Sequence, residues 1–318
     1  MTLSNLLKSS VSSLARGAVG VAGGLALFLA VAGAPGDALA QAADAGSTAG
    51  GGPALWVVKD ADSTLYLFGS VHVLRPETVW ASPRVDAAFD SAETVWFEIS
   101  NPDDQAALTP LIQQHGLSPA RPLSSLLTTE EVADLDTAAR TIGASAAQLD
   151  PLRPWLAALS LAVAPLAKAG YDPASGVELA LKARAEAAGK PIQAFETVDK
   201  QVAILANLPE AVQLVFLRET LEDFDEAVTL IDAMVTDWAE GDVEALDRLV
   251  VQDMKAASPE LYQALLVDRN TDWANQIETM LQGSGTVFIA VGAAHLAGDD
   301  SVQAILEQRG VEVARIED

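Results

Sequence analysis

Apolar residues along this chain form short runs near its two ends and follow helical spacing in between. Alternating or continuous apolar runs predict strands at 55–60, 64–70, 93–100, 190–196, 286–292 and 311–316. Helical spacing covers 102 to about 188, then 209–240, further helices to about 281, and 301–308. This order predicts an α/β fold: a mixed β-sheet built from strands at both ends of the chain, flanked by helices, with a large, mostly helical middle region.

Several local signals mark where these elements begin and end. A three-residue connection at 61–63 between the first two strands predicts a β-hairpin. Thr128 followed by Glu131 is the pattern of a capping box and predicts a helix start. Gly189 and Gly241 each follow a helical segment, where glycine commonly ends a helix.

The first forty residues have the pattern of an export signal. Lys8 and Arg16 precede an apolar segment at 17–33, and Ala-Leu-Ala at 38–40 matches a signal-peptidase site. We therefore predict a signal peptide at 1–40, cleaved after Ala40. An uncleaved membrane anchor is the alternative interpretation, because the apolar segment is close to the length that spans a bilayer.

Cleavage would leave a periplasmic or secreted protein without stable membrane insertion. Residues 41–53 are rich in glycine and alanine and predict a flexible linker. Residues 54–318 are then expected to form a single domain.

Composition narrows the expected partners. Half of the 318 residues are hydrophobic, which indicates a folded chain, and the formal net charge is −25. Such an excess of negative charge argues against binding nucleic acid through bulk electrostatics. A peptide or small-molecule substrate is compatible with this charge. The chain has no cysteine, which does not contradict export.

A repeated motif carries the candidate chemistry. The stretch 65–72, LYLFGSVH, and the stretch 288–295, FIAVGAAH, each place four apolar residues, a glycine and two more residues before a histidine. The chain has three histidines, and His72 and His295 both lie in this context. Ligands bind beyond the carboxyl ends of strands in α/β sheets, so two such strands side by side would place both imidazoles over one site.

Two imidazoles and a carboxylate suit a divalent transition metal. Glu98 follows the apolar run Val95-Trp96-Phe97 near the end of another strand and is the best carboxylate candidate. Histidine and glutamate together bind Mn, Co, Zn or Fe, with open positions for hydrolytic or oxygen-activating chemistry. The alternatives are buried histidines that bond the backbone and a solvated Glu98 at a strand end.

At this point the residues resemble a known family. LYLFGSVHVL, FEIS at 97–100 and VFIAVGAAHLAGDDSVQAILEQRGVEV at the end of the chain resemble the TraB/GumN family, which is related to the Tiki metalloproteases and more distantly to erythromycin esterases and ChaN-like haem-binding lipoproteins. Gly176-x-Glu178, the Phe195-Glu196-Thr197 run with Gln201, Trp238 with Gly241-Asp242, and Arg269-Asn270 also resemble the family pattern. The resemblance covers nearly all of 54–316. It implies an α/β fold and a metal-dependent hydrolase, peptidase-like in the Tiki branch, with His72, His295 and Glu98 as the essential residues.

Four further residues are candidates for catalysis. Glu178 and Glu196 could each act as a general base on a metal-bound water. Arg269 and Asn270 could bind a substrate carbonyl or an oxyanion. The alternatives are a favourable helix-start carboxylate for Glu178, a surface role for Glu196, and an ordinary helix start with Asn270 as N-cap.

The third histidine has no expected role in the site. His115 precedes Gly116 at the end of a helical segment and is interpreted as a helix C-terminal cation.

Three functions remain open from the sequence. The first is an exported metal-dependent hydrolase, a metallopeptidase that uses a metal-activated water. The second is a non-catalytic haem- or metal-binding periplasmic protein. The third is a periplasmic scaffold whose sheet carries two histidines without a ligand.

Overall fold

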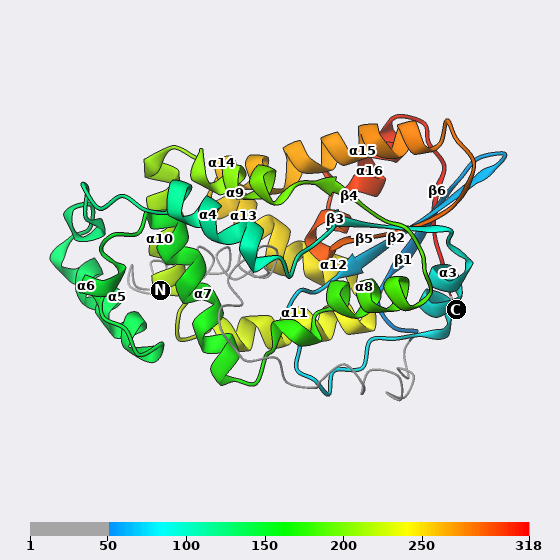
Figure 1. The fold of residues 1–318 in the computed structure, drawn as a ribbon. Helices are drawn as coiled ribbons and strands as arrows, with labels where there is room; N and C mark the ends of the chain where they lie inside the picture. Colours follow the sequence, from blue (N-terminus) through cyan, green and yellow to red (C-terminus); the bar gives the residue numbers. More distant parts are fainter. Residues whose placement is uncertain (1–50, 318) are drawn as a thin grey trace, which may run out of the picture.

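The computed structural model describes residues 51–317 (Figure 1). The expected signal peptide at 1–40 and all but the last residues of the expected linker at 41–53 lie outside this part of the chain. The described residues form a mixed α/β protein, which confirms the predicted fold class.

The sheet is built from β1 (Leu55–Lys59), β2 (Ser63–Ser70), β3 (Thr94–Ile99), β4 (Ile192–Glu196), β5 (Gly285–Gly292) and β6 (Val313–Arg315). The helices are α3 (Pro83–Ser91), α4 (Gln105–His115), α5 (Thr129–Thr141), α6 (Ala146–Leu149), α7 (Pro154–Lys168), α8 (Val177–Ala187), α9 (Val198–Ala206), α10 (Glu210–Glu222), α11 (Ala227–Glu240), α12 (Val243–Leu246), α13 (Gln252–Ala257), α14 (Pro259–Tyr262), α15 (Asp268–Met280) and α16 (Val302–Gln308). Short 3₁₀ turns lie at η3 (Leu123–Ser125), η4 (Pro173–Ser175) and η7 (Ala293–Leu296), and π-helical turns at η5 (Asp247–Val251) and η6 (Gln263–Val267).

The strand order across the sheet is β4-β3-β5-β2-β1-β6. The neighbours among β4, β3, β5 and β2 run parallel, whereas β1 is antiparallel to both β2 and β6. The predicted hairpin joins β1 to β2, and the Asp60 side chain accepts hydrogen bonds from two backbone N–H groups in its turn. Parallel strands end at the same edge, so four strands deliver their last residues to one side of the sheet.

Both faces of the sheet are covered, because successive residues of a strand point to opposite sides. In β5, Phe288 and Ala290 join a large cluster of buried side chains, whereas Ile289 and Val291 join a smaller one on the other face. The smaller cluster includes residues of α15 and α16, which lie above the sheet in Figure 1, with α8 and α11 below it. Burial on both faces explains why the strands of the motif read as continuous apolar runs.

The helical middle region extends beyond the sheet, with α5 and α6 at its far end in Figure 1. Leu156 and Leu159 of α7 and Phe216 of α10 belong to the large core cluster, which links this region to the sheet. One prediction here was wrong: 209–240 is not a single long helix. It breaks into α10 and α11 around Asp223, which caps α10 and is 2% exposed.

The predicted helix ends are confirmed. The Thr128 hydroxyl accepts from Glu131 N, and the Glu131 carboxylate accepts from Thr128 N, which completes the capping box. Gly189 and Gly241 have φ values of 67° and 74°, the left-handed region that glycine adopts most readily at a helix end. Residues 311–316 contribute a shorter strand than predicted, because β6 covers only Val313–Arg315.

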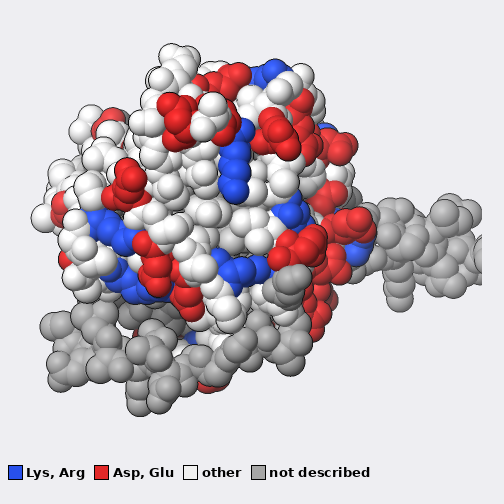
Figure 2. All heavy atoms as spheres, turned by 90° about the vertical axis from the view of Figure 1, so that its right-hand side faces the viewer, with Lys and Arg blue, Asp and Glu red and all other residues white. Residues whose placement is uncertain are grey.

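Among residues 51–317, no helix combines the length and the apolar character needed to cross a bilayer. On the face drawn in Figure 2, lysine and arginine side chains lie close to aspartate and glutamate side chains.

Candidate functional site

The four parallel strands each deliver one candidate residue to the same edge of the sheet. His72 lies just after β2, and His295 lies in η7 directly after β5. Glu98 is the second-last residue of β3, and Glu196 is the last residue of β4. Ser70 of β2 pairs with Gly292 of β5, so the two GxxH units lie side by side, an adjacency that the sequence did not establish.

Gly292 is the point on which three of these side chains converge. A Cβ atom at this position would lie 3.1 Å from Glu98 Oε1, 3.5 Å from His72 Nε2 and 3.6 Å from His295 Cδ2. The Gly292 N–H also donates to Glu98 Oε1 at 2.8 Å. Glycine is therefore needed here for close approach of side chains to the backbone.

His295 is held in one tautomer. Its Nδ1 lies 2.6 Å from Asn270 Oδ1, and the Asn270 amide donates its own N–H to the carbonyl of Asp300 at 2.8 Å. That second bond fixes the amide orientation, so Nδ1 of His295 carries the proton and donates. Nε2 then carries a lone pair, with Arg269 Nη1 at 3.1 Å and Glu98 Oε1 at 3.7 Å from it.

His72 has a corresponding partner. Its Nδ1 lies 2.7 Å from Glu178 Oε1, and the Ser70 hydroxyl donates to the same carboxylate oxygen. Glu178 stands in the first turn of α8, after Gly176. A Cβ on Gly176 would lie 2.2 Å from the His72 carbonyl oxygen, so glycine is needed for α8 to approach the residues that follow β2.

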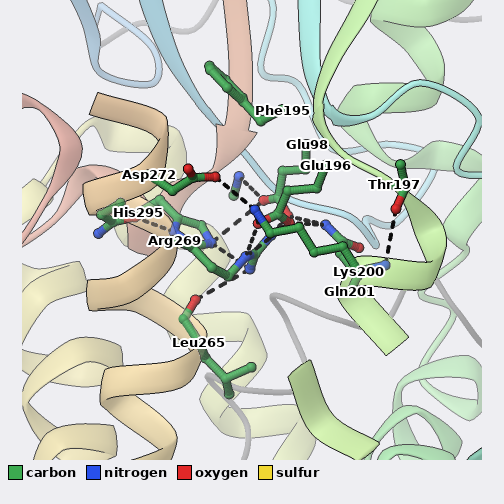
Figure 3. A network of polar contacts seen from close by, with 12 residues as sticks. Glu98, Phe195, Glu196, Thr197, Lys200, Gln201, Leu265, Arg269, Asp272 and His295 are labelled. Carbon is green, nitrogen blue, oxygen red and sulfur yellow. Dashed lines mark hydrogen bonds and ion pairs between the residues drawn. The ribbon is translucent and has the colours of Figure 1, made fainter. Parts of the chain in front are cut away.

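Arg269 occupies the middle of the charged cluster (Figure 3). Its guanidinium donates to Glu98 Oε2 at 2.5 Å and to Glu196 Oε2 at 2.8 Å, and its Nη1 lies 3.1 Å from His295 Nε2. The Gln201 amide donates to both carboxylates, at 3.0 and 3.1 Å. Every member is buried, with 5% or less of each residue exposed, so these charges are compensated within the cluster.

The surroundings fix the charge of each group. Burial by itself raises the pKa of Glu98, but the charge of Arg269 and the two histidines outweigh burial and lower that pKa to about 2. Burial, followed by the charge of Arg269, lowers the pKa of His295 to about 3. Burial lowers the pKa of Arg269, but Glu98 and Glu196 outweigh it and the net pKa is raised. At pH 7 the site therefore holds an ionised Glu98, a neutral His295 and a charged Arg269.

The structure adds detail to the other expected roles. Asn270 lies inside α15 and not at its N-cap, so the alternative interpretation of a helix start does not describe it. The Glu196 carboxylate accepts hydrogen bonds from Arg269 and Gln201 and lies 3.6 Å from Lys200. These contacts favour a role for Glu196 in holding Arg269 in place. His115 ends α4 beside Gly116, as predicted.

Three residues contact the candidate site that sequence reasoning did not place there. These are Ser70, Gln201 and Trp273, whose ring lies 4.4 Å from that of His295 and 4.7 Å from the Arg269 guanidinium carbon. Trp273 follows Arg269 by four residues in a helix, and that spacing places two side chains on one face. This spacing is the signal that could have identified it.

The donor set fits the expected divalent metal only in part. Two imidazoles anchored through Nδ1 and an ionised carboxylate are the donor chemistry of transition-metal sites, where outer hydrogen bonds orient each histidine. The Nη1 contact of Arg269 with His295 Nε2 opposes this fit. In this arrangement, no group of three or more histidine, aspartate and glutamate side chains within residues 51–317 is placed to hold a metal ion. A metal ion at His295 thus requires Arg269 to release that nitrogen.

Fold and site together define a mixed α/β protein with a buried histidine–carboxylate–arginine cluster at the carboxyl edge of four parallel strands. The model of the TraB/PrgY/gumN family matches residues 54–315, and the chain belongs to this family.

The relatives span most of the chain. The uncharacterized protein YbaP of Escherichia coli (strain K12) is 23% identical over 256 residues, which cover 80% of this chain and 92% of YbaP. YbaP of Shigella flexneri matches to the same extent. An uncharacterized protein of Treponema pallidum (strain Nichols) is 23% identical over 273 residues, covering 80% of each chain. No solved structure matches the chain significantly.

Proposed function

We propose that this protein is an exported metal-dependent hydrolase, a metallopeptidase whose divalent transition metal is held by His72, His295 and Glu98. One observation carries the proposal: both histidines have Nδ1 against a side-chain oxygen while their rings approach Glu98 beside Gly292. This orientation presents Nε2 of both rings and one carboxylate oxygen as donors from three adjacent strands. When bound, the metal would supply Lewis acidity and an activated water.

The residues of the chain have distinct parts in this proposal. Glu178 and Asn270 orient His72 and His295, and Asn270 keeps the proton of His295 on Nδ1. Glu98 stays ionised because its pKa is about 2, and its carboxylate lies with both histidine rings around Gly292. Glu196 holds Arg269 beside Glu98, where the guanidinium can stabilise a negative charge that develops on a substrate carbonyl.

The alternative of a haem-binding protein gains no support from these contacts. The histidines face two carboxylates and a guanidinium within the described residues, whereas haem requires an apolar slot beside its axial ligand.

Hydrolysis of peptides with and without metal tests the proposal. The mature protein is freed of metal with a chelator, reloaded with Mn²⁺, Co²⁺, Zn²⁺ or Fe²⁺, and offered a library of fluorogenic peptides. We expect cleavage that depends on the added metal, is lost in His72→Gln and His295→Gln, and persists in the matched control His115→Gln. Cleavage that survives both chelation and His72→Gln would exclude this function.

A further inference from the structure

The proposed function does not explain why Arg269 contacts the expected metal donors. Its guanidinium contacts two of the three expected metal donors, since Nη2 donates to Glu98 Oε2 at 2.5 Å and Nη1 lies 3.1 Å from His295 Nε2. Because Asn270 fixes the proton on Nδ1 of His295, the Nε2 atom accepts the hydrogen bond from Arg269. Arg269 therefore engages the lone pair that a metal ion would need.

We infer that Arg269 is a built-in counter-ion that closes the site in the metal-free protein, and that metal binding must displace it from His295 and Glu98. This inference rests on the proposed metal site. The guanidinium and the metal compete for the same two groups, so Arg269 lowers the affinity of the site for every divalent ion. An ion binds only if its free energy of binding to the donors exceeds that of the contacts that Arg269 makes with them.

The displaced guanidinium can remain bound to Glu196. Nε of Arg269 donates to both Glu196 oxygens, at 3.2 and 3.1 Å, and Nη2 donates to Oε2 at 2.8 Å. The Trp273 ring lies 4.7 Å from the guanidinium carbon. Contacts with Glu196 and Trp273 involve neither His295 nor Glu98, so Arg269 can keep them while it releases the two metal donors.

Competition of this kind selects among ions. Mn²⁺, Co²⁺, Zn²⁺ and Fe²⁺ bind imidazole nitrogen, whereas Mg²⁺ and Ca²⁺ prefer oxygen ligands. An ion that gains little binding free energy from His295 cannot offset the loss of the hydrogen bond between Arg269 and His295. Imidazole-binding ions are therefore expected to open the site, and Mg²⁺ and Ca²⁺ are not.

Direct metal binding tests the inference without an activity assay. Dissociation constants for Co²⁺ and Zn²⁺ are measured by calorimetry on the chelator-treated mature protein, Arg269→Gln and Arg309→Gln. Arg309 lies at the surface, where it pairs with Glu278, so its variant removes the same unit of charge away from the site. We expect Arg269→Gln to bind about tenfold more tightly or better, because a unit charge in contact with the donors is removed. Arg309→Gln should match the wild type.

A second variant keeps the test valid if Arg269→Gln does not fold without metal. Arg269→Lys retains a positive charge for the two carboxylates but lacks the planar fork that reaches His295 and both glutamates together. It is expected to fold and to bind Co²⁺ more tightly than the wild type.

The outcomes separate the inference from the proposed function. Wild-type binding that is equal to or tighter than that of Arg269→Gln and Arg269→Lys overturns the inference and leaves the metal site intact. Binding in the arginine variants but not in the wild type supports the inference in its strongest form. Absence of binding in all variants overturns both the inference and the metal-dependent function.

Discussion

Gly292 shows how one residue can determine a site without contributing a side chain. Its N–H donates to Glu98, and its bare Cα leaves room for Glu98 and His72 on the side where a Cβ would stand. In the repeated motif, the glycine therefore has a second use besides ending the strand. It sets how closely the carboxylate can approach the histidine rings.

Substitution of this glycine should damage the site more than the fold. In Gly292→Ala the new methyl group would lie 3.1 Å from Glu98 Oε1, so the carboxylate must shift. We expect metal affinity to fall by about 10–100-fold, the range typical of residues that support metal ligands. Calorimetry with Co²⁺ measures this. The matched control is Gly283→Ala, where the added Cβ meets only the Met280 carbonyl oxygen, at 3.3 Å. Equal affinity in the two variants would contradict this role of Gly292.

At the scale of the elements, the site depends on parallel strands that end together. The pairing of β2 with β5 and of β5 with β3 brings Ser70, Gly292 and Glu98 to one edge, although they are far apart in the sequence. Helices then supply the residues that orient the donors: α8 brings Glu178, and α15 brings Arg269 and Asn270. The strands hold the donors, and the helices hold the groups that bind to those donors.

This division explains which parts could be predicted from the sequence. The two GxxH units and Glu98 were predictable because an apolar run followed by a polar residue marks a strand end locally. The contact of Arg269 with His295 was not, since it depends on how α15 packs against the residues after β5. The break between α10 and α11 was also missed, because the sequence there contains neither glycine nor proline as a local signal.

The capping box of α5 offers a test of local prediction away from the site. Thr128→Ala removes the hydroxyl that accepts from Glu131 N, which should cost about 1 kcal/mol of unfolding free energy. For a protein of this size, that is a fall in Tm of about 2–4 °C. Differential scanning calorimetry measures it, with Thr129→Ala, an exposed neighbour inside the helix, as the control. A fall of the same size in both variants would show that the cap adds nothing.

At the scale of the whole molecule, buried acidic residues also lie outside the candidate site, distant in sequence from its strands. Asp223 ends α10, and neither of its carboxyl oxygens has a hydrogen-bond partner among the described residues. Burial, followed by the negative charge of Glu219 and further acidic neighbours, raises the pKa of Asp223 to about 8. Burial and Glu222 likewise raise the pKa of Glu219 to about 7. When these carboxyl groups are protonated, the net negative charge of the protein is smaller.

The raised pKa of Asp223 gives stability a defined dependence on pH. The folded state binds a proton that the unfolded state releases between about pH 4 and pH 8, so this group lowers stability as pH rises through that window. Asp223→Asn removes the effect. We expect its Tm to exceed that of the wild type by a few degrees at pH 8.5, since 1 kcal/mol corresponds to about 2–4 °C. The difference should be smaller at pH 5.

The exposed neighbour Asp225 supplies the control for this experiment. Asp225→Asn removes the same charge from the same turn, and its Tm should follow the wild-type curve at both pH values. Parallel curves for Asp223→Asn and the wild type would show that the carboxyl group of Asp223 titrates normally.

The metal content of the purified protein tests most directly whether His72 and His295 form one site. The mature chain is purified without chelator and incubated with Mn²⁺, Co²⁺, Zn²⁺ or Fe²⁺ before elemental mass spectrometry, beside His72→Ala, His295→Ala and His115→Ala. The account predicts stoichiometric transition metal in the wild type and in His115→Ala, and its loss in each of the other two variants. Wild-type protein without metal after incubation, or metal retained when either histidine is removed, would contradict it.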